Sequence, residues 1–406
     1  MRIAVVGAGI IGACIGLALA KRGVEVTLID RDEPGHGCSY GNSGAISPGS
    51  VAPVAMPGVL ASVPRMLLDA ESPLFLPLGY LPRALPWLAQ FVASATPVRV
   101  EESARRLHAF HEGAVAKHVA LATEVGVPEL ILQRGHLHLY PDELALAKDA
   151  GGWRMREAYG YKFERLDRDG ILALEPRVGE RYRIGLYLAD HATVLNPLRY
   201  VQAIVAAFVA KGGKVQRAHV RSLQSLPGAR WRVEAGEASA DFDHAVVAAG
   251  AWSVRLLDPM GLRVPLESQR GYHVQFPGAS QTISRTVILA DKKIFMAPME
   301  EGLRVGGTVE IGGLDRPPDL RRAAMLERIV RETFAGLEGI EPKTWMGHRP
   351  CMPDSVPVVG PAEGRPGLWL ALGHGHLGMT DSIATAERIS GMLVQPMKLT
   401  IQEKAA

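Results

Sequence analysis

The chain has 406 residues, of which 47% are hydrophobic and 21% charged, a balance typical of folded proteins and sufficient for two packed domains. Its 45 basic and 42 acidic residues leave a formal net charge of +3, so no charge excess favours a nucleic-acid partner. Three scattered cysteines are too few for a disulfide framework or a zinc cluster, and they indicate a reducing compartment, with the cytoplasm as the expected location.

The first thirty residues predict a strand, a helix and a second strand. Residues 3–7 are apolar and short enough for a buried strand, and residues 10–22 have helical length and end at Gly23. Residues 24–30 then predict the second strand. This succession has the length of one parallel crossover unit, so we expect it to form the nucleus of a parallel sheet.

A glycine-rich turn, Gly7-Ala8-Gly9-Ile10-Ile11-Gly12, lies between that strand and that helix. Gly7 would permit the tight turn, Gly9 the approach of backbone N–H groups to a pyrophosphate, and Gly12 the close packing of helix on strand. Asp30 ends the second strand, where a carboxylate accepts a hydrogen bond from an adenosine ribose. The sequence therefore predicts a dinucleotide site, although this motif alone does not separate NAD from FAD. The same glycines would break a signal helix, so we expect no secretion signal, and no other stretch has the length and apolarity of a bilayer span.

Residues 51–98 form an apolar, proline-rich segment with few charges. We expect its prolines to interrupt helices. Two interpretations stay open, a buried lid or packing loop and a surface that touches a membrane or a quinone. The eight prolines are Pro53, Pro57, Pro64, Pro73, Pro77, Pro82, Pro86 and Pro97.

The rest of the chain alternates between helical and strand-like patterns. Apolar residues recur at the helix period from 101 to 125, and Gly126 and Pro128 end that helix. Further helices are predicted at 197–211, 320–334 and 381–393. Strands are predicted at 135–140, 185–188, 214–223, 231–234, 244–249 and 368–372, with a strand-rich block at 271–313.

Four stretches, in order along the chain, resemble the D-amino-acid oxidase superfamily of flavoenzymes, and within it the D-amino-acid dehydrogenase branch. The resemblance extends over nearly the whole length. The resemblance rests on the opening glycine turn, the loop Cys38-Ser39-Tyr40-Gly41-Asn42-Ser43-Gly44-Ala45-Ile46-Ser47-Pro48, the strand end Val246-Val247-Ala248-Ala249-Gly250-Ala251-Trp252-Ser253, and the stretch from Gly347 to Gly378. The resemblance implies FAD as the cofactor. Sarcosine oxidases attach their flavin through a cysteine whose position falls on Gly347 here, so we expect FAD to be bound noncovalently.

The resemblance also implies which residues contact FAD. The loop after the second strand would pass under the isoalloxazine, and the turn after residue 248 would pack near the pyrophosphate and ribose. The N–H groups of residues 373–378 would face the flavin, with a positive helix end favouring its reduced, anionic form. The expected contacts are Gly7, Gly9, Ile10, Ile11, Gly12, Asp30, Arg31, Ser39, Asn42, Ser43, Gly44, Ala249, Gly250, Trp252, Gly375, His376, Leu377 and Gly378.

On the substrate side, the resemblance points to Arg349 in Gly347-His348-Arg349-Pro350. In glycine oxidase and its relatives the corresponding arginine binds the substrate carboxylate, a role that suits a planar, permanently charged guanidinium. A structural ion pair is the alternative. Tyr272 would assist the carboxylate, or else be a sheet tyrosine on a dry face, and His374 is the third expected catalytic residue. His273 alternates with Tyr272, so at most one of the two should reach the ligand. The histidines show no metal-ligand spacing, and no metal is expected.

The resemblance implies an α/β fold in which a Rossmann-like FAD-binding domain of the glutathione-reductase type is interleaved with an α+β substrate domain built on an antiparallel sheet. We expect the FAD-binding domain in 1–50, 190–255 and 340–406. The substrate domain is then expected in 51–189 and 256–339.

The expected reaction is oxidation of the Cα–N bond of a small D-amino acid to the imine. The run from Cys38, together with Met56-Pro57-Gly58, resembles members that oxidise cyclic secondary amines such as cis-4-hydroxy-D-proline. The electron acceptor would be a quinone, with peripheral contact to the inner face of the plasma membrane, or oxygen. Alternatives are a broad D-amino-acid substrate range, a glycine- or sarcosine-type oxidase, an FAD-binding β-type subunit of a hetero-oligomeric dehydrogenase, and an NAD-dependent dehydrogenase.

Overall fold

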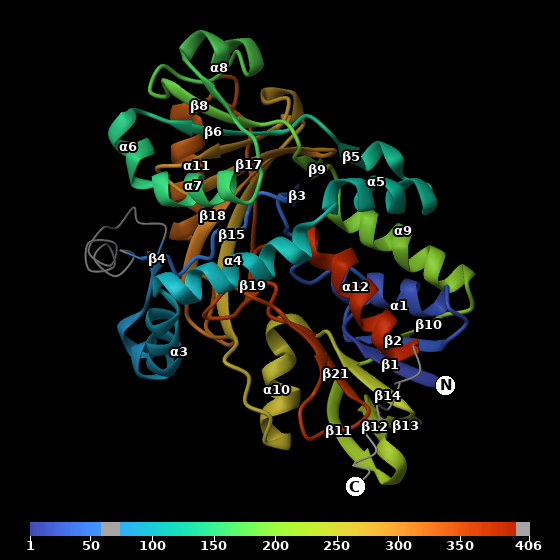
Figure 1. The fold of residues 1–406 in the computed structure, drawn as a ribbon. Helices are drawn as coiled ribbons and strands as arrows, with labels where there is room; N and C mark the ends of the chain where they lie inside the picture. The colour runs from blue at the N-terminus through green and yellow to red at the C-terminus, as the bar shows by residue number, and fades with distance from the viewer. Residues whose placement is uncertain (58–73, 395–406) are drawn as a thin grey trace, which may run out of the picture.

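The computed structural model describes residues 1–57 and 74–394 (Figure 1). The predictions made for residues 58–73 of the proline-rich segment, including Pro64 and Pro73, lie outside the described residues, as does the stretch 395–406. Everything stated below refers to the described part of the chain.

The predicted opening unit is present as β1 (Arg2–Val6), α1 (Ile10–Ala20) and β2 (Glu25–Asp30). β1 lies at the centre of a six-stranded sheet and pairs in parallel with β2 on one side and β14 on the other. The last pairing in the sheet, β20 with β21, is antiparallel. The strand order is β10 (Lys214–Arg217), β2, β1, β14 (His244–Val247), β21 (Leu368–Leu372) and β20 (Val358–Pro361).

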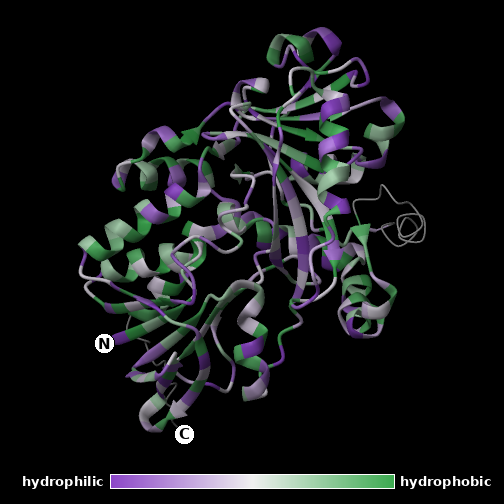
Figure 2. Cartoon of the chain, turned by 180° about the vertical axis from the view of Figure 1, so that it is seen from behind, coloured by the Kyte–Doolittle hydropathy of each residue, from purple (hydrophilic) through white to green (hydrophobic). Residues whose placement is uncertain are grey.

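Each face of this sheet is covered by a different layer, because successive strand residues point to opposite sides. Ile3 and Val5 pack against helices, whereas Ala4 and Val6 pack against a small antiparallel sheet. Figure 2 shows hydrophobic residues concentrated along the strands near the N-terminus. The helices are α1, α5 (Ala114–Glu124), α9 (Pro197–Ala210) and α12 (Gly378–Val394), and the small sheet is β11 (Val220–Leu226), β12 (Arg230–Ala235) and β13 (Ala238–Phe242).

A second, nine-stranded sheet forms the other half of the fold (Figure 1). Its strands β15 and β18 are long and antiparallel, and α11 (Arg321–Thr333) covers one face of them. A short sheet of β3 (Ala45–Ile46), β9 (Ala192–Val194) and β5 (Ile131–Leu132) is separate. The large sheet runs β19 (Lys343–Cys351), β15 (Glu267–Pro277), β18 (Gly302–Ile311), β17 (Ile294–Met299), β16 (Thr286–Leu289), β6 (His136–Tyr140), β8 (Ile184–Leu188) and β7 (Glu164–Leu166), with β4 (Leu74–Phe75) beside β18.

Most of the parallel sheet comes from the three separated pieces in which the FAD-binding domain is predicted. One strand departs from that pattern, because β19 pairs along its whole length with β15 and so lies in the large sheet. Arg349 therefore lies in the large sheet and not in the parallel sheet. The predicted division into two domains otherwise stays a prediction.

Two helix predictions were wrong in detail. The single helix predicted at 101–125 is two helices, α4 (Pro97–His111) and α5, because Gly113 has a φ of +67° and breaks the helical path. The prolines Pro82 and Pro86 do not prevent a helix, since both lie in α3 (Leu81–Ser94). Pro82 is in the first turn, where the missing N–H has no intrahelical acceptor to lose. The remaining helices are α6 (Glu143–Lys148), α7 (Ala150–Ala158), α8 (Arg168–Leu174) and α10 (Ser253–Leu257).

Candidate active site

The turn between β1 and α1 requires glycine. Gly7 has a φ of +111°, and a Cβ there would lie 2.3 Å from the Ala248 carbonyl oxygen. A Cβ on Gly12 would lie 1.8 Å from the Gly7 oxygen. Gly9 is the N-cap of α1 and brings no side chain over the helix end. The first turn, including Ile11, therefore presents backbone N–H groups and a positive helix end to any group bound there.

Two polar side chains hold this turn in place. Asp30 Oδ2 accepts a hydrogen bond from Ala8 N–H at 2.6 Å, and Ser39 Oγ accepts one from Ile10 N–H at 2.9 Å. Predicted cofactor contacts from three separate segments thus meet at the N-terminus of α1. Asp30 is only half-buried, so its carboxylate retains lone pairs for a ribose hydroxyl in addition to its role in the turn.

Arg31 and Trp252, both predicted cofactor contacts, lie side by side at the ends of β2 and β14. The Arg31 guanidinium carbon is 4.1 Å from the centroid of the Trp252 indole, a cation–π distance. His348 packs edge-on against the same indole at 5.0 Å. Ala249 and Gly250 precede Trp252, and Gly250 has a φ of +56°. The structure therefore brings Arg31 and Trp252 together, and Ala249 lies against the glycine turn, since a Cβ on Gly7 would be 3.0 Å from its Cα.

The loop that follows Ser39 is shaped by its own amide and glycine residues. Asn42 Oδ1 accepts a hydrogen bond from Gly44 N–H at 2.7 Å, and Gly44 has a φ of +71°. The Gly44 carbonyl accepts from Val194 N–H at 2.7 Å, which joins the loop to β9. Ser43 lies against β18, because a Cβ on Gly306 would be 3.1 Å from its Oγ. The loop is thereby held between the parallel sheet and the large sheet.

Sequence reasoning missed Arg304, which fixes this loop from the other side. Its Nη1 donates to the carbonyl oxygens of Tyr40 at 2.8 Å and Asn42 at 2.7 Å, and its Nη2 donates to Gln275 Oε1 at 2.7 Å. Burial lowers the pKa of Arg304 to about 10, which still leaves the guanidinium charged at neutral pH. No local motif marks this residue, because its two partners in the loop, Tyr40 and Asn42, lie more than 250 residues away in the chain.

Arg349 lies on the face of the large sheet that is directed at this loop. It pairs with Gln269 across β19 and β15, and its guanidinium lies over Gly271, where a Cβ would be 2.2 Å from it. Nη1 donates to the Thr308 carbonyl at 2.8 Å, at a β-bulge where Thr308 has a φ of +63°. Within the described residues no carboxylate forms an ion pair with Arg349, so its charge is available to a ligand.

The titratable side chains of Cys38, His273 and Cys351, from three segments, lie within electrostatic reach of Arg349. Burial raises the pKa of Cys38 and raises that of Cys351 to about 12, while the nearby guanidinium opposes both shifts. Burial, Arg304 and then Arg349 lower the pKa of His273 to about 3. The thiols are therefore protonated and the imidazole neutral at physiological pH, and the guanidinium supplies the positive charge.

An aromatic wall, made by Tyr40, His273 and Trp345, stands beside Arg349. His273 and Trp345 are stacked, with ring centroids 5.0 Å apart, and the Tyr40 ring meets the indole edge-on at 6.1 Å. The indole lies flat against the backbone, since a Cβ on Gly41 or Gly347 would be 1.9 or 2.0 Å from it. His273 Nδ1 donates to the Gly41 carbonyl at 3.1 Å. The wall is therefore anchored to the loop of residues 38–48, called the cofactor-side loop below.

Tyr272 does not occupy the position predicted for it beside the substrate carboxylate. It lies on the opposite face of β15 from His273 and Arg349, in the core beneath α11, and is 1% exposed. Its hydroxyl donates to Glu310 Oε2 at 2.6 Å and accepts from Asp319 N–H at 2.7 Å. Because side chains alternate along a strand, only one of Tyr272 and His273 can lie on the face of β15 that is next to Arg349. That residue is His273.

His374 also differs from its predicted role. Its Nε2 forms a hydrogen bond with Thr385 Oγ1 at 2.9 Å, the residue is 4% exposed, and burial lowers the pKa of the imidazole to about 4. Its backbone bridges to Cys351, and Gly375 N–H donates to the Pro350 carbonyl at 2.8 Å. His374 therefore packs the C-terminal loop onto α12. The remaining predicted contacts of that loop, His376, Leu377 and Gly378, lead directly into α12.

The residues present fit a dinucleotide cofactor. The backbone at the start of α1 is open because glycines occupy the positions where side chains would collide, and a carboxylate stands at the end of β2. The loop after Ser39 and the N-terminus of α12 converge on the same region, since Ser47 N–H donates to Thr380 Oγ1 at 3.0 Å. Backbone donors and one acid are the groups that such a cofactor requires.

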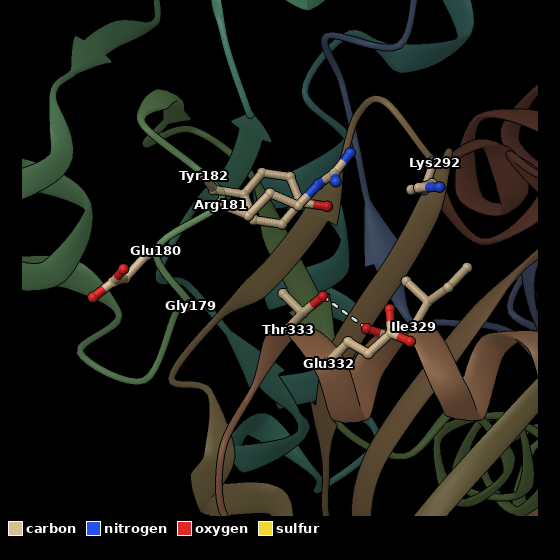
Figure 3. A pocket seen from close by; sticks show the side chains of 8 residues that line it. All are labelled: Gly179, Glu180, Arg181, Tyr182, Lys292, Ile329, Glu332 and Thr333. Atoms are coloured by element: carbon tan, nitrogen blue, oxygen red, sulfur yellow. Dashed lines mark hydrogen bonds between the residues drawn. The ribbon is translucent and has the colours of Figure 1, made fainter.

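A separate hollow of about 250 Å³ lies elsewhere in the molecule (Figure 3). Residues of the turn before β8 and of α11 line it, and the Thr333 hydroxyl there donates to the Ile329 carbonyl at 2.7 Å. Charges of both signs surround it without a cluster of one kind, and none of the residues near Arg349 lines it. The lining residues are Gly179, Glu180, Arg181, Tyr182, Lys292, Ile329, Glu332 and Thr333.

Within residues 1–57 and 74–394, no group of three or more His, Cys, Asp or Glu residues could hold a metal ion. Nor does any helix there combine the length and apolarity needed to cross a membrane.

Residues 2–392 match the family model described as DAO, FAD dependent oxidoreductase. The chain is 37% identical over 400 residues to a D-amino-acid oxidase of Bradyrhizobium diazoefficiens, covering 96% of this chain and 94% of that protein. It is 33% identical over 396 residues to a D-amino acid dehydrogenase of Rhodopseudomonas palustris, covering 95% and 92% of the two chains.

Solved structures agree on the fold. Glycine oxidase from Geobacillus kaustophilus superimposes with a TM-score of 0.74 at 20% identity, covering 97% of this chain and 94% of that one. L-proline dehydrogenase from P. horikoshii gives a TM-score of 0.74 at 17% identity, covering 97% and 93%. These likenesses confirm the expected flavoenzyme architecture, and at such identities they speak for the fold alone.

Proposed function

The chain belongs to the DAO family of FAD-dependent oxidoreductases, and we therefore propose that it oxidises the Cα–N bond of a small D-amino acid to the imine. FAD is the cofactor. Within this activity we propose a D-proline-type substrate such as cis-4-hydroxy-D-proline. The relatives named for D-amino acids support the first statement, and the wall beside Arg349 supports the second.

One observation carries the proposal, namely an arginine with unpaired charge facing the cofactor-side loop. Thr308 and Gly271 fix the Arg349 guanidinium from behind, which leaves its other N–H groups to grip a carboxylate in parallel hydrogen bonds. A substrate held by its carboxylate has its α-carbon at a defined place relative to the loop of Asn42 and Ser43.

The residues of this chain contribute position rather than proton transfer. FAD, when bound, supplies the acceptor for the hydride that leaves the α-carbon. Arg349 holds the carboxylate, and the neutral His273 and Trp345 exclude water from one side of the amine. No side chain is assigned as a general base, because an amine bound in its neutral form needs none. The imine then leaves and hydrolyses in water.

The aromatic wall bears on the substrate side chain. His273 is held neutral and Trp345 is apolar, so the surface next to Arg349 offers no charge to an acidic or basic side chain. A flat, apolar ring face suits a pyrrolidine ring or a small aliphatic group. We propose that this wall selects cyclic and small apolar D-amino acids.

The test is the absorbance of the purified, flavin-loaded protein during anaerobic mixing with candidate substrates. We expect bleaching by cis-4-hydroxy-D-proline and D-proline to be faster than by D-alanine, and slow bleaching by glycine or sarcosine. Dominant turnover of an L-amino acid would reject the stereochemical proposal. A protein that stays fully oxidised with the whole panel would reject the activity of the isolated chain.

The variant Trp345→Leu tests the wall within the same panel. It should lower kcat/KM for the cyclic substrates about 3- to 10-fold more than for D-alanine, because only a ring loses the flat contact. Trp369→Leu is the matched control, since Trp369 lies on β21 against His244, away from the wall. An equal loss with ring-containing and open-chain substrates would contradict the selecting role.

We propose that the electron acceptor is a quinone in an anionic membrane. The protein would contact the surface of that membrane through α3. Leu85 and Val92, seven residues apart on α3, are 53% and 41% exposed and form an apolar stripe on that helix. Leu78, 85% exposed, lies in the short turn just before the helix. Residues 74–100 contain Arg83 and Arg99 and no acidic residue, a charge that suits anionic lipid headgroups.

We expect the protein to sediment with vesicles containing phosphatidylglycerol and not with vesicles of phosphatidylcholine alone. The double variant L85E/V92E should lose this binding while retaining bound FAD. Leu144→Glu is the control, because Leu144 is 69% exposed on α6 and lies outside the stripe. Absence of binding to either vesicle, together with fast peroxide formation in air-saturated buffer, would instead favour oxygen as the acceptor.

A further inference from the structure

Two ionisable side chains that the proposed reaction does not use are completely buried and face each other. His111 ends α4 and Asp381 lies in the first turn of α12, and both side chains are 0% exposed. His111 Nε2 is 3.1 Å from Asp381 Oδ1, yet neither atom, nor Asp381 Oδ2, makes a hydrogen bond of normal geometry. Buried polar atoms in this condition cost free energy, so the contact requires a physical explanation.

The number of protons that the two side chains share explains the contact. His111 Nδ1 lies 3.1 Å from the Pro48 carbonyl oxygen, which only accepts, so Nδ1 carries a hydrogen. In a neutral imidazole Nε2 would then be a bare lone pair facing an ionised carboxylate in a dry interior, an arrangement that is repulsive. One more proton, on Nε2 or on Asp381, removes the repulsion. The pair therefore holds one shared proton and has no net charge.

This pair lies where the cofactor-side loop meets the N-terminus of α12. Ser47 N–H donates to Thr380 Oγ1 at 3.0 Å, one residue before Asp381, and Gly49 N–H donates to His191 Nε2 at 3.3 Å. Pro48, between them, is the residue that His111 contacts. Ser47 and Pro48 are the last residues of the loop expected to pass under the flavin, and Gly49 directly follows it.

We propose that His111 and Asp381 share one proton in order to keep the N-terminal turn of α12 free of net negative charge, so that this helix end stays positive toward the flavin. An uncompensated carboxylate in the first turn would cancel the partial positive charge of the helix end, which is about half an elementary charge. Both are positioning residues, because they act through the helix and through Pro48. The inference rests on the FAD site and not on the identity of the substrate.

The buried imidazoles near the pair are neutral between pH 6 and pH 9, and the partly buried His108 on α4 is present in every variant and in the wild type. Burial lowers the pKa of the imidazoles of His118, His136, His374 and His376 to about 4, and it lowers that of His191 further. Burial also lowers the pKa of Arg388, which is still a guanidinium with a far higher ordinary value. A pH dependence of sulfite affinity that appears on breaking the pair, and that the double variant lacks, is therefore assigned to the loss of the shared proton.

The experiment measures the affinity of sulfite for the bound FAD, because this small anion reports the positive potential around the flavin. The holoenzyme variants are His111→Asn, Asp381→Asn and the double variant. Asparagine at 111 keeps an N–H for Pro48 and removes the partner of Asp381. We expect H111N to bind sulfite about tenfold more weakly at pH 9 than at pH 6, beyond any change in the wild type. D381N and the double variant, which lack the carboxylate, should stay within about twofold of the wild type at both pH values.

An H111N protein that follows the wild type across this range would overturn the proposal, as would a double variant as weak as H111N. Should H111N fail to fold, ¹⁵N NMR of histidine-labelled wild-type holoenzyme decides. We expect His111 to carry one proton on Nδ1 and to share a second proton between Nε2 and Asp381 from pH 6 to pH 9. A signal from an unprotonated Nε2 without a hydrogen bond would contradict the proposal. Both readouts are independent of turnover, so a failed substrate panel leaves them interpretable.

Discussion

Replacing Arg349 with alanine is expected to lower kcat/KM for every amino acid substrate about a thousandfold. The guanidinium would make two charge-assisted hydrogen bonds to the carboxylate, each worth about 1.5–3 kcal/mol. Losing them also loses the alignment of the α-carbon, so kcat should fall together with a rise in KM. Arg349→Lys should recover part of the loss, because an ammonium supplies the charge but not the planar fork. Steady-state kinetics with a dye acceptor provide the measurement.

The control for this variant is Arg168→Ala. Arg168 is also partly buried and also donates to backbone carbonyls, those of Gly179, Tyr182 and Val178. It lies away from the site, so its loss should reduce stability and leave kcat/KM within a few fold of the wild type. If R349A behaves in the same way as R168A, Arg349 is a structural arginine and the proposed reaction loses its anchor.

Replacing Glu310 with alanine is expected to destabilise the protein by about 3–5 kcal/mol, the cost of leaving one buried charge without its partner. Arg270 and Glu310 are both 0% exposed and 3.0 Å apart, and the Tyr272 hydroxyl donates to the second carboxylate oxygen. Arg270 Nε already has no hydrogen-bond partner, and without Glu310 the guanidinium keeps the Arg316 carbonyl as an acceptor but no carboxylate to balance its charge. Denaturant unfolding of the flavin-loaded protein, followed by circular dichroism, measures the change.

The same network separates the two roles considered for Tyr272. Tyr272→Phe should cost about 1–2 kcal/mol, as expected for a buried hydrogen bond, and leave kcat/KM unchanged. Asp241→Asn is the surface control, because its ion pair with Arg232 is solvent-accessible at the surface and should change stability by less than about 1 kcal/mol. A large drop in kcat/KM for Y272F at unchanged stability would restore Tyr272 to the catalytic set.

Features that depend on residues close together in the chain were predictable from the sequence. The unit from β1 through α1 to β2 is confirmed, because its glycine requirement arises between residues only a few positions apart. FAD as the cofactor and membership of the flavoenzyme family are likewise confirmed. The roles of Arg349 and of the individual cofactor contacts stay predictions, although the structure brings these residues to one region.

Helix boundaries in the proline-rich part were less predictable, because proline weakens a helix only where its missing N–H would have had an acceptor. Pro82 stands in the first turn of α3 and removes no bond, a fact that depends on where the helix begins. The break at Gly113 was invisible for a similar reason. Glycine is tolerated in a helix, and only its φ of +67° ends α4 and starts α5.

The amino-acid sequence alone determined the family and the cofactor, because short motifs with fixed spacing encode them. Only the tertiary structure decided that His273 rather than Tyr272 contacts the loop after Ser39, that Arg304 holds that loop, and that His111 meets Asp381 in the interior. Each of these contacts joins residues more than 200 positions apart and depends on strand register and on how helices pack over the sheets. Periodicity along the chain carries no information about such partners.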